Sequence, residues 1–315
     1  MKYLTIVLSS FIALSISADM ACKGVCIELK KDFPYENNQA RFSYKNYEER
    51  YINNSSYKDS SWSNSTIRNL EIVDSSIVES SFSGVLVANA SVENTTFLDN
   101  KMSYSQYSQA SFINVDMEDS EFNSTKFGRA VFINVNGEET NFNSSSMPQA
   151  QISQSIFEDA EFKYANLILS NIKSTIFSES EMNNINISHS SLSNVMFEDT
   201  KLSSADFSFS DLDSVSFDES EIKYGEFSTA KITNSTFIDA ELNNSDFSMS
   251  EITNVDFSES DLSSANFAFS TLKDVDLSNT KLEYANFSGA IFINVKIDGA
   301  NISNVKDSGS QGSPF

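Results

Sequence analysis

Residues 191–270 decide the fold when they are written in lines of twenty: SLSNVMFEDTKLSSADFSFS, DLDSVSFDESEIKYGEFSTA, KITNSTFIDAELNNSDFSMS and EITNVDFSESDLSSANFAFS. Every fifth residue is large and apolar, as at Leu192, Phe197 and Leu202, and the residue two places before it is small. A period of five matches neither the 3.6-residue period of a helix nor the two-residue period of a strand. A fixed repeat of this kind predicts a solenoid of stacked units.

We call the position of the large apolar residue in each five-residue unit its centre. The same frame runs from Phe42 to Ile302 without an insertion or deletion, and Gly137 is the one centre that is not apolar. One inserted residue would turn every later side chain to the wrong face of a strand. The unbroken frame therefore predicts a rigid scaffold over residues 42–302.

Three units show the consensus of the repeat most clearly: Ala205-Asp206-Phe207-Ser208-Phe209, Ala265-Asn266-Phe267-Ala268-Phe269 and Ala285-Asn286-Phe287-Ser288-Gly289. The chain resembles the pentapeptide-repeat family, whose units contain a small residue, Asp or Asn, Leu or Phe, Ser or Thr, and then any residue. The resemblance implies an all-β fold, a right-handed quadrilateral parallel β-helix of about 13 coils of 20 residues. The centre and the small residue two before it would point inward, and the other three outward.

The spacing of the aromatic residues supports four sides independently of the family. One phenylalanine ladder with steps of twenty residues runs from Phe157 to Phe257, and a second, shifted by ten, runs from Phe207 to Phe287. Leu and Ile occupy the centres between them. Two opposed sides should therefore carry Phe and two should carry Leu or Ile. Stacked rings bury large apolar areas in offset contact, so we expect most of the stability to come from these ladders.

Residues 1–18, MKYLTIVLSSFIALSISA, have one basic residue, an apolar run and a small residue at Ala18. This pattern predicts a secretory signal peptide cleaved before Asp19, with an uncleaved anchor as the competing interpretation. The run is short for a bilayer span, and no second apolar stretch follows, so we expect no stable membrane insertion. The predicted location is secreted or periplasmic.

Residues 19–41 are predicted to form a cap over the first coil, because an open β-helix end exposes strand edges. They contain the two cysteines of the chain, Cys22 and Cys26. In an oxidising compartment an even count favours a disulfide. Lipidation of Cys22 is the alternative, and a two-ligand metal site lacks a nearby histidine.

Residues 303–315, SNVKDSGSQGSPF after Ile302, are rich in Gly and Ser, and we expect them to be disordered. With no cap apparent in the sequence, the C-terminal end of the β-helix would be exposed. End-to-end homodimerisation, which occurs in some relatives, would cover it.

The chain carries 44 acidic and 21 basic residues, a formal net charge of −23. Acids recur every twenty residues at an outward position two after a centre, which predicts one column of carboxylates along the rod. Its members are Asp59, Glu79, Asp99, Asp119, Glu139, Asp159, Glu179, Asp199, Glu219, Asp239 and Glu259. Two charges one strand spacing apart repel by about 0.9 kcal/mol in water. The predicted interaction face comprises the eight acids from Asp119 to Glu259.

Three functions fit this column. The leading hypothesis is an exported, non-enzymatic rod that offers a structural or interaction surface to a basic protein or surface. The resemblance implies the first alternative, a DNA mimic that inhibits or protects a DNA-binding enzyme such as gyrase, because acidic relatives occupy the DNA site of gyrase. The second alternative is weak multivalent binding of divalent cations such as Ca²⁺, which prefers hard oxygen ligands. A solvating face that prevents aggregation is the non-functional interpretation.

No pattern in the sequence indicates catalysis, a cofactor or a metal site. His189 is the single histidine and occupies an ordinary outward position. No Walker loop, dinucleotide fingerprint or Cys/His cluster occurs, and bases are too few for direct nucleic-acid binding. Tyrosines at intervals of sixty residues from Tyr44 to Tyr284 fit either a relic of duplication or a row that stacks against a regular surface such as a glycan.

Overall fold

A computed structural model describes residues 31–32, 36–39, 41–42 and 44–315. The predicted signal peptide, Cys22 and Cys26 lie outside these residues. Within them the secondary structure consists of strands and turns. The strands are β1 (Lys31–Asp32), β2 (Glu36–Asn38), β3 (Asn46–Asn53), β4 (Ser56–Lys58), β5 (Thr66–Val73), β6 (Ser76–Val78), β7 (Leu86–Ala88), β8 (Ser91–Leu98), β9 (Ser111–Asp116), β10 (Val131–Asn136), β11 (Gln151–Ser153), β12 (Asn171–Ile176), β13 (Ser191–Met196), β14 (Asp211–Ser216), β15 (Lys231–Thr233), β16 (Glu251–Thr253), β17 (Thr271–Asp276) and β18 (Ile291–Lys296).

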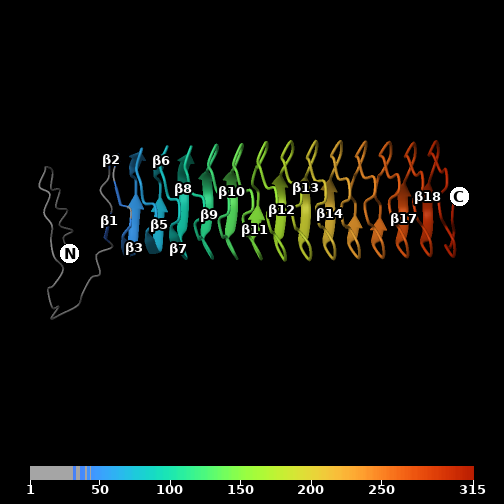
Figure 1. Ribbon diagram of the computed structural model, residues 1–315, viewed down its shortest axis with the longest axis horizontal. Helices are drawn as coiled ribbons and strands as arrows, with labels where there is room; N and C mark the ends of the chain where they lie inside the picture. The colour runs from blue at the N-terminus through green and yellow to red at the C-terminus, as the bar shows by residue number, and fades with distance from the viewer. Residues whose placement is uncertain (1–30, 33–35, 40, 43) are drawn as a thin grey trace, which may run out of the picture. The chain divides into compact units, whose positions relative to one another are not determined.

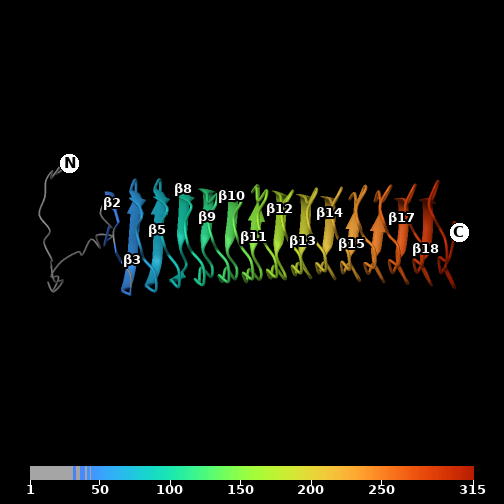
Figure 2. The same ribbon diagram turned by 45° about the horizontal axis from the view of Figure 1, so that its top comes forward.

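Parallel pairing joins each coil to the next with an offset of twenty residues, which confirms the predicted circuit. Leu192 in β13 pairs with Leu212 in β14, and Leu212 pairs with Ile232 in β15. Single bridges with the same offset occur at up to three further places in a coil, spaced by five residues, as for Glu221 with Glu241. The residues from β1 onward therefore form a four-sided parallel β-solenoid, whose coils lie side by side along one axis (Figures 1 and 2).

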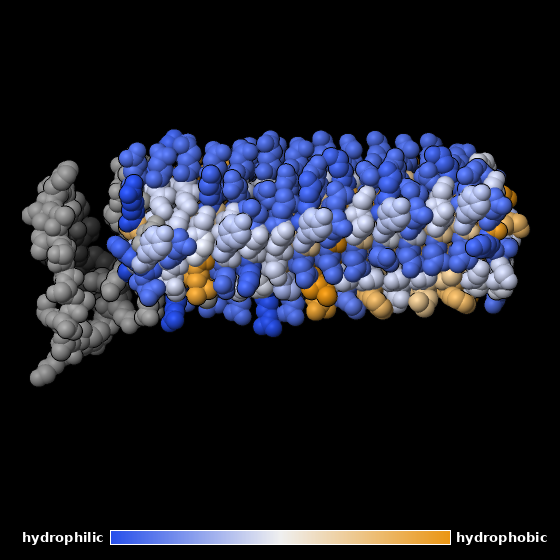
Figure 3. All heavy atoms as spheres, in the orientation of Figure 1, coloured by the Kyte–Doolittle hydropathy of each residue, from blue (hydrophilic) through white to orange (hydrophobic). Residues whose placement is uncertain are grey.

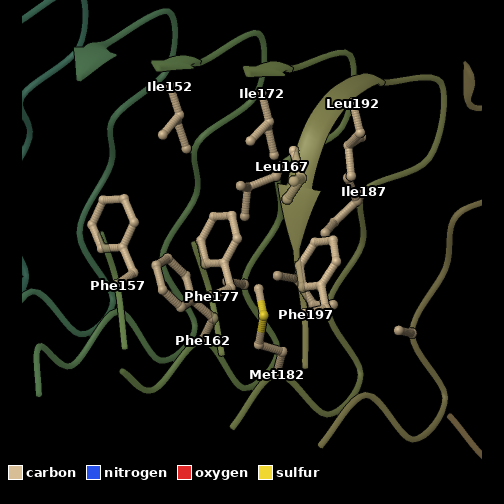
Figure 4. Packing of buried hydrophobic residues seen from close by; sticks show 14 of the residues in the cluster. Ile152, Phe157, Phe162, Leu167, Ile172, Phe177, Met182, Ile187, Leu192 and Phe197 are labelled. Atoms are coloured by element: carbon tan, nitrogen blue, oxygen red, sulfur yellow. The ribbon is translucent and has the colours of Figure 1, made fainter. Parts of the chain in front are cut away.

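The interior is built as the repeat predicts, since the centre and the small residue two before it are buried in coil after coil. Figure 4 shows centres such as Phe157, Ile172 and Phe177 pointing into the coil. Many of the buried small residues are Ser or Thr, and most of their hydroxyls donate to backbone carbonyls, although the Ser145 hydroxyl has no partner among the described residues. Ser180 Oγ, for example, donates to the Phe157 carbonyl at 2.6 Å. A buried hydroxyl with such a partner avoids the cost of an unsatisfied polar group.

The two phenylalanine ladders are confirmed, and they also touch each other across the core. Phe207 stacks on Phe227 with ring centroids 5.0 Å apart and planes 3° apart. Phe207 meets Phe217 of the opposed ladder edge to face at 5.4 Å. Both arrangements are favoured by aromatic quadrupoles. Nearer the N-terminus a stacked ladder occupies another side, where Phe142 lies between Phe122 and Phe162.

Both predicted ends of the repeat differ from the structure. β2 already pairs with β4 at the offset of twenty, so the coil begins before the predicted boundary at residue 42. The prediction of disorder for residues 303–315 is wrong. The Gln311 amide donates to the Ala290 carbonyl at 2.9 Å, and the Phe315 ring packs 5.1 Å from Phe287 and 5.6 Å from Phe292. The small residues of this segment still fit the repeat, and its last aromatic ring covers part of the open end.

Candidate interaction surface

The acidic column follows one corner of the solenoid, and the backbone conformation of that corner favours its aspartates. From Asn54 to Asn304, every fifth residue, two after a centre, has a positive φ and turns the chain into the next side. Among non-glycine residues, Asn and Asp tolerate this left-handed region best. The eight acids from Asp119 to Glu259 have φ values between 51° and 66° and are all exposed.

The structure brings all eight predicted acids together in one straight line. Each backbone N–H donates to a carbonyl nineteen residues later, in the next coil, so successive corners lie directly over one another. The donors and distances are Asp119 3.2 Å, Glu139 3.0 Å, Asp159 3.3 Å, Glu179 3.0 Å, Asp199 3.1 Å, Glu219 2.9 Å, Asp239 3.1 Å and Glu259 3.0 Å. The acidic column is used below for these eight residues.

Like charges accumulate at the N-terminal part of the column. Asp119 is the main cause of a raised pKa at Glu139, and burial, Asp159 and Glu138 act in the same direction. Burial and then Asp116 and the column raise the pKa of Glu118. These raised carboxyl pKa values mean that the neighbouring carboxylates disfavour the charged form. A bound cation would relieve this repulsion.

Lysines neutralise the acids on the neighbouring side but not the column itself. Glu181 pairs with Lys163 and with Lys201, the latter at 2.7 Å, and together these ammonium groups lower the pKa of Glu181 to about 2. Lys223 lies 2.5 Å from Glu241. Among the described residues, no Lys or Arg nitrogen lies within 4.0 Å of a carboxylate of the acidic column.

An open groove of about 460 Å³ lies between the acidic column and this neutralised side. Acids line most of it, and two lysines contribute at its edge. Its residues are Asp199, Thr200, Lys201, Glu219, Glu221, Asp239, Ala240, Glu241, Glu259, Asp261 and Lys281. The described residues contain no group of three or more His, Cys, Asp or Glu side chains arranged to hold a metal ion. The groove therefore offers extended negative charge instead of a coordination cage.

A ladder of side-chain amides, which was not predicted, follows the adjacent corner, five residues before the acidic column in each coil. Asn114 donates to Asn94 at 2.9 Å, and Asn134 donates to Asn114 at the same distance. Asn254 likewise donates to Asn234 at 2.9 Å. Amide side chains can be donor and acceptor at once, so identical residues stack in register. The recurrence of Asn every twenty residues was the available signal in the sequence.

The C-terminal coil exposes apolar side chains where the solenoid stops. Ile293 is 47% exposed and Ile302 is 41% exposed, although Ile302 is a centre of the repeat. Val295 and Ile297 are only partly buried. In the preceding coils the centres are fully enclosed by their neighbours. This end therefore lacks the cover that one more coil would supply.

A family model described as a pentapeptide repeat region matches residues 150–227 and 230–306. The chain belongs to the pentapeptide-repeat family. No curated protein matches this pentapeptide-repeat chain at a significant level. Across the part of the chain that the structure describes, no helix is long and apolar enough to cross a membrane.

Several solved pentapeptide-repeat proteins are similar to this chain at low sequence identity. HetL of the cyanobacterium Nostoc sp. strain PCC 7120, involved in the regulation of heterocyst differentiation, is 14% identical over 70% of this chain and 87% of its own, with a TM-score of 0.38. QnrB1, a plasmid-mediated fluoroquinolone resistance protein, is 18% identical over 74% of this chain and 91% of its own, with a TM-score of 0.31. A pentapeptide-repeat protein of the Arabidopsis thaliana thylakoid lumen is 29% identical over 29% of this chain and 59% of its own, with a TM-score of 0.24.

Proposed function

We propose that this pentapeptide-repeat protein is an exported, non-enzymatic rod whose acidic column binds a basic protein or surface. The observation that carries the proposal is the unpaired state of the column among the described residues, beside a side on which lysines neutralise the acids. A partner that brings cations to the column would relieve the repulsion between its neighbours. It would meet a rigid, regular array, because the backbone hydrogen bonds fix every corner.

Mimicry of DNA has weaker support. Duplex DNA carries its charges on two wound strands at about one per 1.7 Å of axis. The acidic column instead follows one corner of the solenoid, with a single column residue in each coil. Binding of divalent cations has no coordination geometry among the described residues.

Binding of a basic protein probe, such as lysozyme, measured by calorimetry at low salt tests the acidic column. The variant Asp159→Asn, Asp199→Asn, Glu219→Gln and Asp239→Asn should weaken binding by at least tenfold. The matched control removes four acids from β8, β14, β16 and β17: Glu93→Gln, Asp211→Asn, Glu251→Gln and Asp274→Asn. Equal weakening by both variants would contradict the proposal, since only net charge would then matter.

Export is tested separately, by fractionating cells that express the full chain and determining the N-terminus of the product. The proposal expects the mature chain to begin at Asp19 and to lie outside the cytoplasm. Retention of residues 1–18 on a cytoplasmic product would refute export without affecting the binding measurement.

The exposed C-terminal coil favours a second contact, end to end with another copy of the chain. Ile293 and Ile302 would be buried there, and the free strand edge of the last coil would be covered. Light scattering should give a dimer for the unaltered chain and a monomer for Ile293→Ser with Ile302→Ser. A monomeric unaltered chain at micromolar concentration would exclude this contact.

A further inference from the structure

A different side of the solenoid carries exposed aromatic and apolar side chains that the fold itself does not require. This side comprises the segments YANLIL (164–169), NINISH (184–189), SADFSF (204–209), YGEFST (224–229), NSDFSM (244–249), SANFAF (264–269) and YANFSG (284–289). Each segment begins at one corner and ends at the next, and the seven stack in register. We call it the aromatic side. Figure 3 shows apolar side chains interrupting an otherwise mostly hydrophilic surface of the rod.

One corner of the aromatic side carries four exposed apolar residues over six coils. Leu169 is 53% exposed, Phe209 54%, Met249 59% and Phe269 71%. The His189 ring stacks on Phe209 with centroids 4.7 Å apart and planes 4° apart. The opposite corner carries Tyr164, Tyr224 and Tyr284, each more than half exposed. Phe209, Phe269 and the His189 ring therefore lie along one edge of a flat strip, and the tyrosines, three coils apart, lie along the other edge.

The backbone makes these residues an unfavourable choice for stability alone. Phe209 has a φ of 58° and Phe269 a φ of 60°, in the left-handed region where bulky side chains are disfavoured. Other corners carry Asn or Asp in the same conformation, as at Asn234 and Asp239. Exposure to water adds a second unfavourable contribution. Neither backbone preference nor burial explains why Phe209 and Phe269 occupy this corner. Contact with a binding partner explains their presence better.

The strip between the two rows is negatively charged. Asp206, Glu226 and Asp246 are direct neighbours in the bridge ladder. No described Lys or Arg pairs with any of the three, and the seven segments contain no Lys or Arg. The floor of the strip is made of small side chains such as Ser208 and Ser248. A ligand with both positive charge and a flat π-system would therefore complement the rings and the carboxylates together.

We propose that the aromatic side binds an arginine-containing polypeptide segment, with guanidinium groups stacked on the corner rings and paired with Asp206, Glu226 and Asp246. Arginine combines a planar face that stacks on aromatic rings with donors that match a carboxylate, whereas the lysine ammonium is a point charge. The surface is separate from the acidic column and goes beyond the function proposed above.

The test measures fluorescence anisotropy of labelled nona-arginine and nona-lysine with the purified full chain. The unaltered protein binds nona-arginine more tightly than nona-lysine. Phe209→Asn with Phe269→Asn weakens nona-arginine binding by about fivefold to thirtyfold and nona-lysine binding by less than about twofold. Asn suits the corner conformation better than Phe, so a Tm that is unchanged or higher verifies that the fold is intact.

The acidic-column variant described above distinguishes the two proposals, because it weakens both peptides alike and leaves the preference for arginine unchanged. Equal losses for the two peptides in the Phe209 and Phe269 variant would overturn the proposal, as would no loss for either. A soluble neutral β-glucan that binds through the same two rings, without competition from nona-arginine, would show a glycan surface and would also overturn it.

Discussion

The Phe157 ring occupies the space above Gly137, one coil earlier. A Cβ placed on Gly137 would lie 2.4 Å from Phe157 Cδ1 and 3.2 Å from Thr140 Oγ1. Phe157 is held there by Phe177, which stacks on it at 5.5 Å, and by Phe142, which meets it edge to face at 5.8 Å. Gly137 therefore interrupts the apolar frame because a larger side chain at this position would overlap the Phe157 ring.

Restoring the apolar consensus by Gly137→Leu should destabilise the protein. The new side chain would overlap a buried ring that its neighbours hold in place, and overpacking of this kind costs about 1 to 3 kcal/mol. Gly128→Ala is the matched control, because the nearest contact of an added Cβ is Pro148 Cγ at 3.7 Å. Urea unfolding monitored by circular dichroism should show a lower midpoint for the first variant alone. An unchanged or higher midpoint for Gly137→Leu would contradict the packing account.

Lys201→Met should lower stability in a pH-dependent way. Hydrogen bonds from Lys163 and Lys201 lower the pKa of Glu181 from 4.5 to about 2. Because the folded-state pKa is lowered, the stabilisation is present above pH 4.5 and is lost as the pH falls toward 2. The difference in Tm from the unaltered chain should be about 1 °C at pH 7 and vanish near pH 2. A difference that persists unchanged at pH 2 would show that the ion pair is not its cause.

Glu139→Gln should raise the stability of the protein at neutral pH, the opposite of the effect expected for Lys201→Met. Asp119 and the other nearby acids raise the pKa of Glu139, so the folded state disfavours its negative charge. This penalty is absent below pH 4.5 and appears as the pH rises through the folded-state pKa. The variant should melt about 1 °C higher at pH 7 and no higher at pH 3, and 1 M salt should reduce the gain. Glu251→Gln, away from the column, is the control, and an equal gain there would argue against local repulsion.

Phe315→Ser should loosen the C-terminal coil while leaving the middle of the rod intact. The variant removes the ring that packs on Phe287 and Phe292, and in a solenoid each coil contacts only its neighbours. Hydrogen exchange should accelerate at the amides of Phe292 and Gln311, which bond within the last coils. The amide of Phe217 serves as the internal control. Uniform acceleration along the rod would instead indicate that the solenoid unfolds as one unit.

The sequence by itself determined the circuit of twenty residues, the inward positions and the alignment of the acidic column. These follow from a repeat without insertions or deletions. When every coil has twenty residues, residues twenty apart in the sequence must lie over one another in neighbouring coils. The confirmed pairing of Leu192 with Leu212 is the direct consequence. The Asn corner was predictable on the same grounds, from the recurrence of Asn94, Asn114 and Asn134.

Only the tertiary structure decided which charges are paired, how the ends close and which rings meet. Lys201 pairs with Glu181 in the neighbouring coil while Asp199, two residues away, has no described cation partner. Phe207 and Phe217 touch across the core although they belong to opposed ladders. Phe315 folds back on the last coil from a segment whose composition predicted disorder. Each outcome depends on side-chain reach and packing between coils, and a one-dimensional repeat does not encode those distances.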